Sequence, residues 1–398
     1  MTALKNNFST PFPHVNILLP VLILVIVGLL VMTSATIHLN SFNPWYYTQK
    51  HIIFLTIGIV SGFFIYNYFS FDKYQQSKSI WVILYLISII LLLTPIIPIL
   101  GVEHYGARRW IRLPFGFEFQ TSEIAKITLI MSMSSYLQCV SRKSVIHVHR
   151  LYWNEVKQLG FYSLWLLLPT ILFALQKDFG SIVAMFVVWF VLLYLYRFSL
   201  RVLLLIIPIC LVLFAVLIIM EPYRVERVIN FQKPFTYNRE LLISSAKDTG
   251  YQILQSKIAL VQGGLFGVGV GEGVQKLLHL PKAHNDFIFS TIVEEYGVIG
   301  AVFLLLVFTS LIITLLRDAS RFSQNSATCS ASLHTAFALW IFCLVLLHIG
   351  SGIGFLPTKG ITLPFISYGG SNLVSLLLFV ALLSSCRKHS NKEMAKAI

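Results

Sequence analysis

Charged side chains are scarce in this sequence, and one acidic residue stands out by its position. Asp286 follows His284 and Asn285 and comes directly before a long apolar run that opens with Phe287. A carboxylate at the start of a helix is held in its ionised form, and it can then accept a proton from a reacting hydroxyl group. Asp286 is therefore the leading candidate for a general base, with simple helix capping as the alternative role. His284 is interpreted as an interfacial side chain.

Arginines and a lysine–glutamate pair form a second motif. Arg108 and Arg109 precede Trp110, and Glu123 and Lys126 follow on one expected helix. Because Glu123 and Lys126 are three residues apart, they share a face of that helix and can pair where an unpaired charge would be costly. Arginines are suited to clamp a pyrophosphate, so Arg108 and Arg109 are candidate ligands for one. A structural ion pair with interfacial arginines fits the same pattern.

Two further motifs contribute polar groups. Asp178 lies in the very short connector 176–181, where capping of the next helix is its default role. The segment 354–371 contains prolines and many small residues, which predicts a broken or kinked helix that lines protein or water rather than lipid. Packing explains the small residues, but it does not easily explain Lys359, Ser367 and Tyr368 together.

The elements that must position these residues are membrane helices. Of 398 residues, 57% are hydrophobic and only 12% are charged, whereas soluble domains carry about 25% charged residues. The net charge of +14 is spread over short connectors, so no nucleic-acid partner is expected. The five cysteines are an odd number outside the long outer loop, so no structural disulfide is expected. We therefore expect an all-α integral membrane protein that forms a single polytopic domain over residues 1–398.

Apolar runs and helix breakers predict about ten transmembrane helices. They cover residues 16–36, 51–69, 79–100, 123–140, 161–176, 180–197, 202–220, 287–316, 332–350 and 361–385. A large extracytoplasmic loop, 221–286, separates helices seven and eight, and an amphipathic stretch near 256–260 predicts a helix on the membrane surface. The glycine-rich run 263–273 has no strand before it, so it is predicted to be a flexible or closely packed loop that shapes a groove.

Lysines and arginines are distributed unevenly between the two sides of the membrane. Fifteen lie in the connectors on the side of the termini, whereas the short connectors opposite hold six. The positive-inside rule therefore places both termini in the cytoplasm. Of the sixteen acidic residues, only Asp72, Glu155, Asp318 and Glu393 fall on the cytoplasmic side. The chemistry of the chain is accordingly expected at the outer face.

Together, these motifs in this order resemble the SEDS family (shape, elongation, division and sporulation) of membrane glycosyltransferases over nearly the full chain. Residues 357–364 resemble the FtsW and SpoVE branch more than RodA. The resemblance implies polymerisation of lipid II into glycan strands at the outer face of the bacterial cytoplasmic (inner) membrane during cell division, with release of undecaprenyl pyrophosphate. It also implies a class B penicillin-binding protein transpeptidase and other division proteins as partners.

The resemblance assigns roles to individual residues. It places the family's essential aspartate on Asp286 and its motif residues on Glu123, Lys126 and Asp178. Asp286 would take the proton from the 4-hydroxyl group of the acceptor sugar, while Arg109, Lys126 or a divalent cation (Mg²⁺ or Mn²⁺) would balance the charge of the diphosphate. A lipid II flippase and a non-catalytic division scaffold are the alternative functions. Clustering of ionisable residues at the outer face favours chemistry there.

Overall fold

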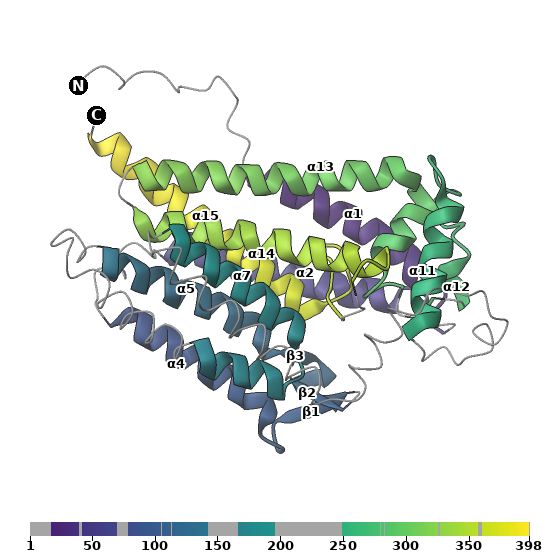
Figure 1. The fold of residues 1–398 in the computed structure, drawn as a ribbon, viewed down its shortest axis with the longest axis horizontal. Helices are drawn as coiled ribbons and strands as arrows, with labels where there is room; N and C mark the ends of the chain where they lie inside the picture. Colours follow the sequence, from purple (N-terminus) through teal and green to yellow (C-terminus); the bar gives the residue numbers. More distant parts are fainter. Residues whose placement is uncertain are drawn as a thin grey trace.

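A bundle of long helices makes up most of the computed structural model, with a small sheet and short helices gathered at one end (Figure 1). The structure describes residues 17–39, 42–69, 79–104, 106–112, 114–141, 166–195, 249–278, 280–281, 283–324, 327–356 and 360–397. Within these ranges, five helices are long and apolar enough to cross a bilayer. They are α1 (Leu18–Thr36), α2 (Tyr46–Tyr68), α13 (Ile288–Gln324), α14 (Thr328–Gly352) and α15 (Gly370–Ala397).

Among the described residues, four further helices belong to the bundle, and most predicted spans match a helix. The four are α4 (Ile80–Leu93), α5 (Thr121–Ser141), a helix over Leu166–Leu175, and α7 (Phe179–Leu195). The predicted span 202–220 and the first part of the loop, residues 221–248, lie outside the described residues, so the count of ten spans stays a prediction. The helix expected near 256–260 is confirmed as α11 (Thr249–Gly263), which packs on α13 and α14.

The sequence did not reveal a small antiparallel sheet. The helix predicted over 79–100 ends at Leu93, because Pro95 lacks a backbone N–H group and the chain tightens there into the 3₁₀ turn η1 (Thr94–Ile96). Three strands follow in the order β1-β2-β3. They are β1 (Gly101–His104), β2 (Ala107–Arg112) and β3 (Glu118–Gln120). The predicted helical fold is confirmed, and this small sheet is added to it.

The last predicted span also needs correction at its start. Helix α15 begins at Gly370 rather than at residue 361, and residues 360–369 form an irregular turn. Phe365 in this turn has φ of 64°, a left-handed conformation that is uncommon for a residue with a side chain. The structure therefore confirms the predicted interruption of the helix in this segment.

The starts of α5, α7, α13 and α15 lie close together, which collects the functional motifs at one end of the bundle. Strands β1–β3, helices α11 and α12 (Gln275–Leu278) and the turn 360–369 all lie at this end, which we name the loop end (Figure 1). Helix α2 packs along α15, α13 along α14 and α4 along α5, with buried aliphatic and aromatic side chains between them. At the opposite end, Asp318 is paired with Arg321 and Arg387.

Helix α13 is interrupted near its start by Gly297, whose φ of 67° and ψ of −171° are not helical. The backbone groups freed by this break bond to the glycine-rich run. Val268 N–H donates to the Glu294 carbonyl at 2.9 Å, and Val298 N–H donates to the Gly264 carbonyl at 3.0 Å. A Cβ atom on Gly297 would overlap the backbone of this run. Gly263 and Gly267 are therefore closely packed against α13, whereas the side chains of Leu265, Phe266 and Val270 in the same run are exposed.

A fully buried ion pair connects the broken helix to its neighbours. Lys276 of α12 donates to Glu295 of α13, and both side chains have 0% exposure. Lys276 also donates to Ser34 of α1 at 2.7 Å, and Ser34 donates in turn to Glu295 at 2.6 Å. Because an unpaired charge is costly in such surroundings, this triad fixes three elements relative to one another.

Candidate active site

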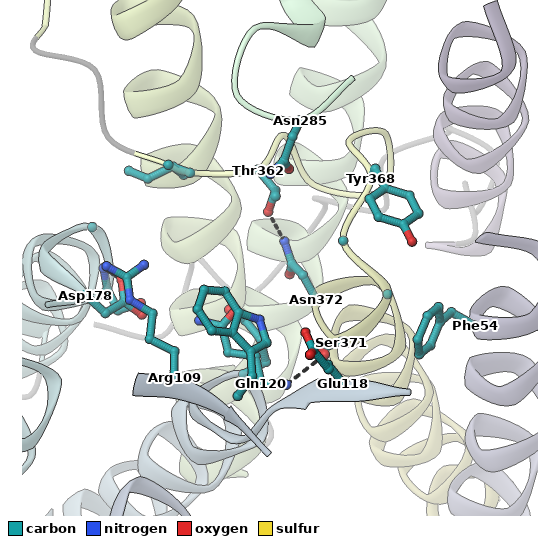
Figure 2. A pocket seen from close by; sticks show the side chains of 18 of the residues that line it. Phe54, Arg109, Glu118, Gln120, Asp178, Asn285, Thr362, Tyr368, Ser371 and Asn372 are labelled. Atoms are coloured by element: carbon teal, nitrogen blue, oxygen red, sulfur yellow. Dashed lines mark hydrogen bonds between the residues drawn. The ribbon is translucent and has the colours of Figure 1, made fainter. Parts of the chain in front are cut away.

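A polar cavity of about 480 Å³ opens at the loop end, between the sheet, α5, α7 and the start of α15 (Figure 2). Side chains from most of the motifs singled out in the sequence line it. The lining comprises Lys50, Phe54, Arg109, Trp110, Gly116, Phe117, Glu118, Gln120, Glu123, Lys126, Asp178, Gly180, Ser181, Asn285, Leu344, Gly360, Ile361, Thr362, Tyr368, Gly369, Gly370, Ser371 and Asn372. Segments distant in sequence therefore surround a single space.

Glu123 and Lys126 form the predicted pair on α5. Lys126 Nζ donates to Glu123 Oε1 at 2.7 Å and to Ser181 Oγ at 3.3 Å, and it lies 4.9 Å from the centre of the Trp340 ring. Ser181 Oγ donates to Asp178 Oδ2 at 2.7 Å. A continuous buried chain of polar contacts thus runs from Glu123 to Asp178, a proximity that the sequence could not establish.

Asp178 caps a helix and also lines the cavity. It directly precedes α7 and accepts the N–H of Ser181 at 3.3 Å, so it caps that helix. Burial alone would raise the pKa of Asp178, but the positive charges of Arg109 and Lys126 and the bonds from Ser181 hold it below its ordinary value. Asp178 is therefore an ionised cap whose charge the cavity stabilises.

The two neighbouring arginines have different surroundings. Arg109 reaches the cavity, and its Nε and Nη2 donate to the backbone carbonyls of Gln176 at 2.7 Å and Lys177 at 2.5 Å. It thereby holds the turn before Asp178, where Lys177 adopts a left-handed φ of 60°. Arg108 instead pairs with Glu103 across the β1–β2 ladder at 3.1 Å and is exposed. The structure does not bring Arg108 into the cavity.

Asp286 lies at the edge of the cavity, next to Gly360. A Cβ atom on Gly360 would stand 3.6 Å from Asp286 Oδ2, and both Gly360 and Asn285 line the cavity. Asp286 is half-buried in the turn before α13, and Phe287 takes the position immediately before that helix. The Phe287 carbonyl accepts the N–H of Ser290 at 3.0 Å. Asp286 therefore stands one residue outside the capping position.

The turn 360–369 is bonded to the segment that carries Asp286. Ser367 Oγ donates to the Asn285 carbonyl at 2.8 Å and accepts the Leu363 N–H at 2.8 Å. Tyr368 N–H donates to the His284 carbonyl at 3.0 Å. Ser367 is buried and does not line the cavity, so its hydroxyl group positions the backbone beside Asp286.

Tyr368 is a cavity residue, as its motif suggested. Its ring packs edge-on against Tyr47 with 5.4 Å between ring centres. Burial and the nearby Tyr46 and Tyr47 hydroxyl groups raise the pKa of Tyr368 to about 12, so the phenol stays protonated and can donate a hydrogen bond. Lys359 lies outside the described residues, and its proposed role stays a prediction.

Several cavity residues were missed by sequence reasoning. Lys50 was counted only as a topology signal, and Glu118, Gln120, Thr362 and Asn372 were not considered as site residues. In Figure 2, Gln120 meets Ser371, whose Oγ accepts the Gln120 N–H at 2.9 Å, and Asn372 donates to Thr362. Their only sequence signal was polarity close to a helix start, which is too common to single them out.

Comparison with known proteins decides the family. A family model named for FtsW, RodA and SpoVE and described as "Cell cycle protein" matches residues 14–392. The chain belongs to the FtsW/RodA/SpoVE family. The resemblance noted from the motifs is thereby confirmed, and with it a multi-pass membrane protein.

Relatives within this family are similar along nearly their whole length. A probable peptidoglycan glycosyltransferase FtsW of Coxiella burnetii is 35% identical over 373 residues, covering 90% of this chain and 92% of the relative. The FtsW of Saccharophagus degradans, with the same description, is 34% identical over 382 residues, covering 94% and 92%. This likeness agrees with the predicted FtsW branch.

Solved structures share the fold. RodA of Thermus thermophilus superposes with a TM-score of 0.64 at 23% identity, covering 94% of this chain and 96% of RodA. A chain from the structure described as "Structural coordination of polymerization and crosslinking by a peptidoglycan synthase complex" gives a TM-score of 0.71 at 23% identity, covering 94% and 97%. The FtsW/RodA/SpoVE fold is therefore present here.

Proposed function

We propose that this chain is a peptidoglycan glycosyltransferase that polymerises lipid II at the outer face of the bacterial cytoplasmic membrane. The observation that carries the proposal is the cavity at the loop end, where residues of most of the motifs meet with Asp286 at the edge. The relatives from C. burnetii and S. degradans are named for the same activity. Their likeness to this chain also supports a role in cell division.

Asp286 is the general base of the proposed reaction. Its carboxylate accepts the proton of the acceptor's 4-hydroxyl group as that oxygen forms a bond to the anomeric carbon of the donor. The bond between the anomeric carbon and the donor's diphosphate breaks, and the electron pair leaves with undecaprenyl pyrophosphate. Because a carboxylate is a weak base towards an alcohol, proton transfer has to accompany departure of the diphosphate. The bonded turn 360–369 keeps the segment of Asp286 in place for this step.

The distribution of ionisable groups favours chemistry over lipid transport. Among the described residues, the buried ion pairs lie near the two ends of the helices. Glu123–Lys126 and Lys276–Glu295 lie at the loop end, and Asp318 with its arginines lies at the other. A flippase needs polar groups along the path of its headgroup. The described ion pairs lie near the ends of the helices instead of along such a path.

A divalent cation is a further candidate for balancing the charge of the diphosphate. Within the described ranges, no three His, Cys, Asp or Glu side chains form a group that could hold a metal ion. The carboxylates of Glu123 and Asp178 already accept bonds from Lys126 and Ser181. These residues do not form a complete cage, although Mg²⁺ commonly binds through substrate phosphates with only one or two carboxylates. Dependence on Mg²⁺ or Mn²⁺ therefore stays a prediction.

The proposal includes an orientation and a partner. The excess of lysine and arginine in the connectors opposite the loop end supports cytoplasmic termini and an outward-facing cavity. The fold neighbour from a peptidoglycan synthase complex supports pairing with a transpeptidase of the class B penicillin-binding type. Other division proteins are expected to join this pair.

The test is reconstitution of the full chain, alone and with its transpeptidase, in liposomes that contain labelled lipid II. Gel separation of the products measures polymerisation, and quenching of label in the outer leaflet measures translocation. We expect glycan polymer from at least one of the two preparations. Translocation without polymer would identify a flippase, and loss of both activities with intact partner binding would identify a scaffold.

A further inference from the structure

The two cationic side chains first considered as ligands of the diphosphate, Lys126 and Arg109, already bind groups within the protein. Lys126 is paired with Glu123 at 2.7 Å, and Arg109 holds the backbone turn at Gln176 and Lys177 beside the ionised Asp178. The two cations and the two carboxylates cancel in net charge. These four side chains together therefore present no net charge to a diphosphate that enters the cavity.

Lys50 is different from the other cations of the cavity. It lines the cavity from the second turn of α2, and none of the described residues places a carboxylate within ion-pair distance of it. Its recorded contact is with the Tyr46 ring, whose centre lies 4.4 Å from Lys50 Nζ. The remaining acid of the lining, Glu118, is paired with His104 at 2.7 Å. Counting all its ionisable side chains, the described lining holds three cations and three carboxylates, and Lys50 is the cation that neither a carboxylate nor a backbone carbonyl holds.

The packing of α2 places Lys50 beside the start of α15. Phe54 lies one helical turn after Lys50 on the same face and also lines the cavity. A Cβ atom on Gly370 would overlap the Phe54 ring, so the two helices meet closely there. The first turn of α15 contains no acidic side chain that could neutralise Lys50. An incoming anion therefore has no competitor for this lysine among the described residues.

We propose that Lys50 binds the diphosphate of the lipid-linked sugar. This inference rests on the proposed function, since it names the group that recognises the charged part of that substrate. Lys50 meets the diphosphate without first breaking an ion pair, whereas Lys126 and Arg109 hold the fold of the cavity. A charge-assisted hydrogen bond to a phosphate oxygen is among the stronger polar contacts in proteins. Lys50 therefore contributes to binding of the substrate before reaction and of the diphosphate product after it.

The experiment compares Lys50→Gln and Lys50→Arg with the parent chain, all full length and paired with the transpeptidase. Lys388→Gln is a matched control, because Lys388 also stands 4.4 Å from a tyrosine ring, that of Tyr66, but does not line the cavity. We expect Lys50→Gln to raise KM for lipid II about tenfold, and to weaken inhibition by inorganic pyrophosphate by a similar factor. Lys50→Arg should retain most of the affinity, and Lys388→Gln should match the parent.

The same phosphate chemistry could come from an anionic phospholipid, and the lipid composition distinguishes the two sources. The assays are run in phosphatidylcholine nanodiscs with and without phosphatidylglycerol. An effect of Lys50→Gln in phosphatidylcholine alone supports the substrate diphosphate. An effect that requires phosphatidylglycerol, an unchanged KM and pyrophosphate inhibition, or a change in kcat alone would overturn the inference.

Calorimetric titration of inorganic pyrophosphate provides a readout that does not need catalysis. Weaker binding to Lys50→Gln than to the parent and to Lys388→Gln supports the site, and equal binding contradicts it. If the parent chain makes no polymer in any preparation, the proposed function fails. The titration then still decides whether Lys50 binds a diphosphate.

Discussion

Ser367 donates its hydroxyl hydrogen to the carbonyl oxygen of Asn285, the residue before Asp286, at 2.8 Å. The same hydroxyl oxygen accepts the N–H of Leu363, so one side chain connects the turn 360–369 to the segment that carries Asp286. Position matters for a general base, because a misplacement of about 1 Å can cost about a hundredfold in rate. Ser367 is therefore expected to act on catalysis through backbone geometry.

Replacing Ser367 with alanine tests this positioning role. We expect kcat for polymerisation to fall about tenfold to a hundredfold with little change in KM, because the segment before Asp286 loses its tether. Ser375→Ala is the control, since Ser375 is equally buried but bonds only to the Ser371 carbonyl within its own helix. Equal rates for the two variants would show that the Ser367 bond does not position Asp286.

Removing one partner of the buried Lys276–Glu295 pair should destabilise the fold strongly. Lys276→Met leaves the Glu295 carboxylate buried without its counter-ion, at an expected cost of about 3–5 kcal/mol in unfolding free energy. The double variant Lys276→Met, Glu295→Met should recover most of this loss. The exposed pair Arg108–Glu103 provides the comparison, because Arg108→Met should lower the unfolding free energy by only about 0–1 kcal/mol. Denaturant titration in detergent compares the three variants with the parent chain, and a small effect of Lys276→Met would contradict this account of the pair.

Alanine at Gly297 is expected to destabilise the protein more than alanine at Gly271 of the glycine-rich run. Alanine at Gly297 meets both a left-handed φ of 67° and the backbone of Leu265 and Gly267, whereas Gly271 has a φ of 88° with no atom near an added Cβ. Both variants carry the conformational cost of about 1–3 kcal/mol, and Gly297→Ala adds the overlap. Thermal unfolding in detergent should therefore show a larger loss for Gly297→Ala. Equal losses of stability in the two variants would show that the close approach of the loop backbone to Gly297 does not contribute to stability.

Acidification should remove the stability that ionised Asp178 contributes. The pKa of Asp178 in the folded protein lies below its ordinary value, so the contribution is complete above the unfolded pKa of about 3.9 and is lost as the pH falls through the folded pKa. Asp178→Asn should therefore be less stable than the parent at pH 7, and the difference should shrink below about pH 4. Unfolding curves between pH 7 and pH 3 measure this difference. A gap that stays constant with pH would contradict an ionised cap.

Much of the helical fold could be predicted from the sequence because its signal is local. A span such as 16–36 is an almost continuous apolar run, and the structure places α1 over Leu18–Thr36. The sheet over 101–120 was missed because its strands have three to six residues each, too few for an alternating pattern to be recognised. The irregular turn before Gly370 was only partly anticipated, since prolines and glycines indicate a break without giving its length.

The site was predictable in its residue types but not in its contacts. The Glu123–Lys126 pair follows from helical spacing alone, and the structure confirms it at 2.7 Å. The link through Ser181 to Asp178 and the engagement of Arg109 by backbone carbonyls depend on how separate helices pack, which no spacing encodes. Lys50 was overlooked because what sets it apart is that no carboxylate of the described cavity pairs with it. That feature also depends on how the helices pack.

The most direct measurement is polymerisation of purified lipid II by Asp286→Ala and Asp286→Asn, each purified with its transpeptidase. Asp286→Asn keeps the shape of the side chain and removes its capacity to accept a proton, so both variants should yield no detectable glycan while still binding lipid II and the partner. Glu103→Gln serves as the carboxylate control, because Glu103 is exposed, pairs with Arg108 and does not line the cavity, so this variant should retain activity. Undiminished glycan from both Asp286 variants would contradict the assignment of Asp286 as the general base.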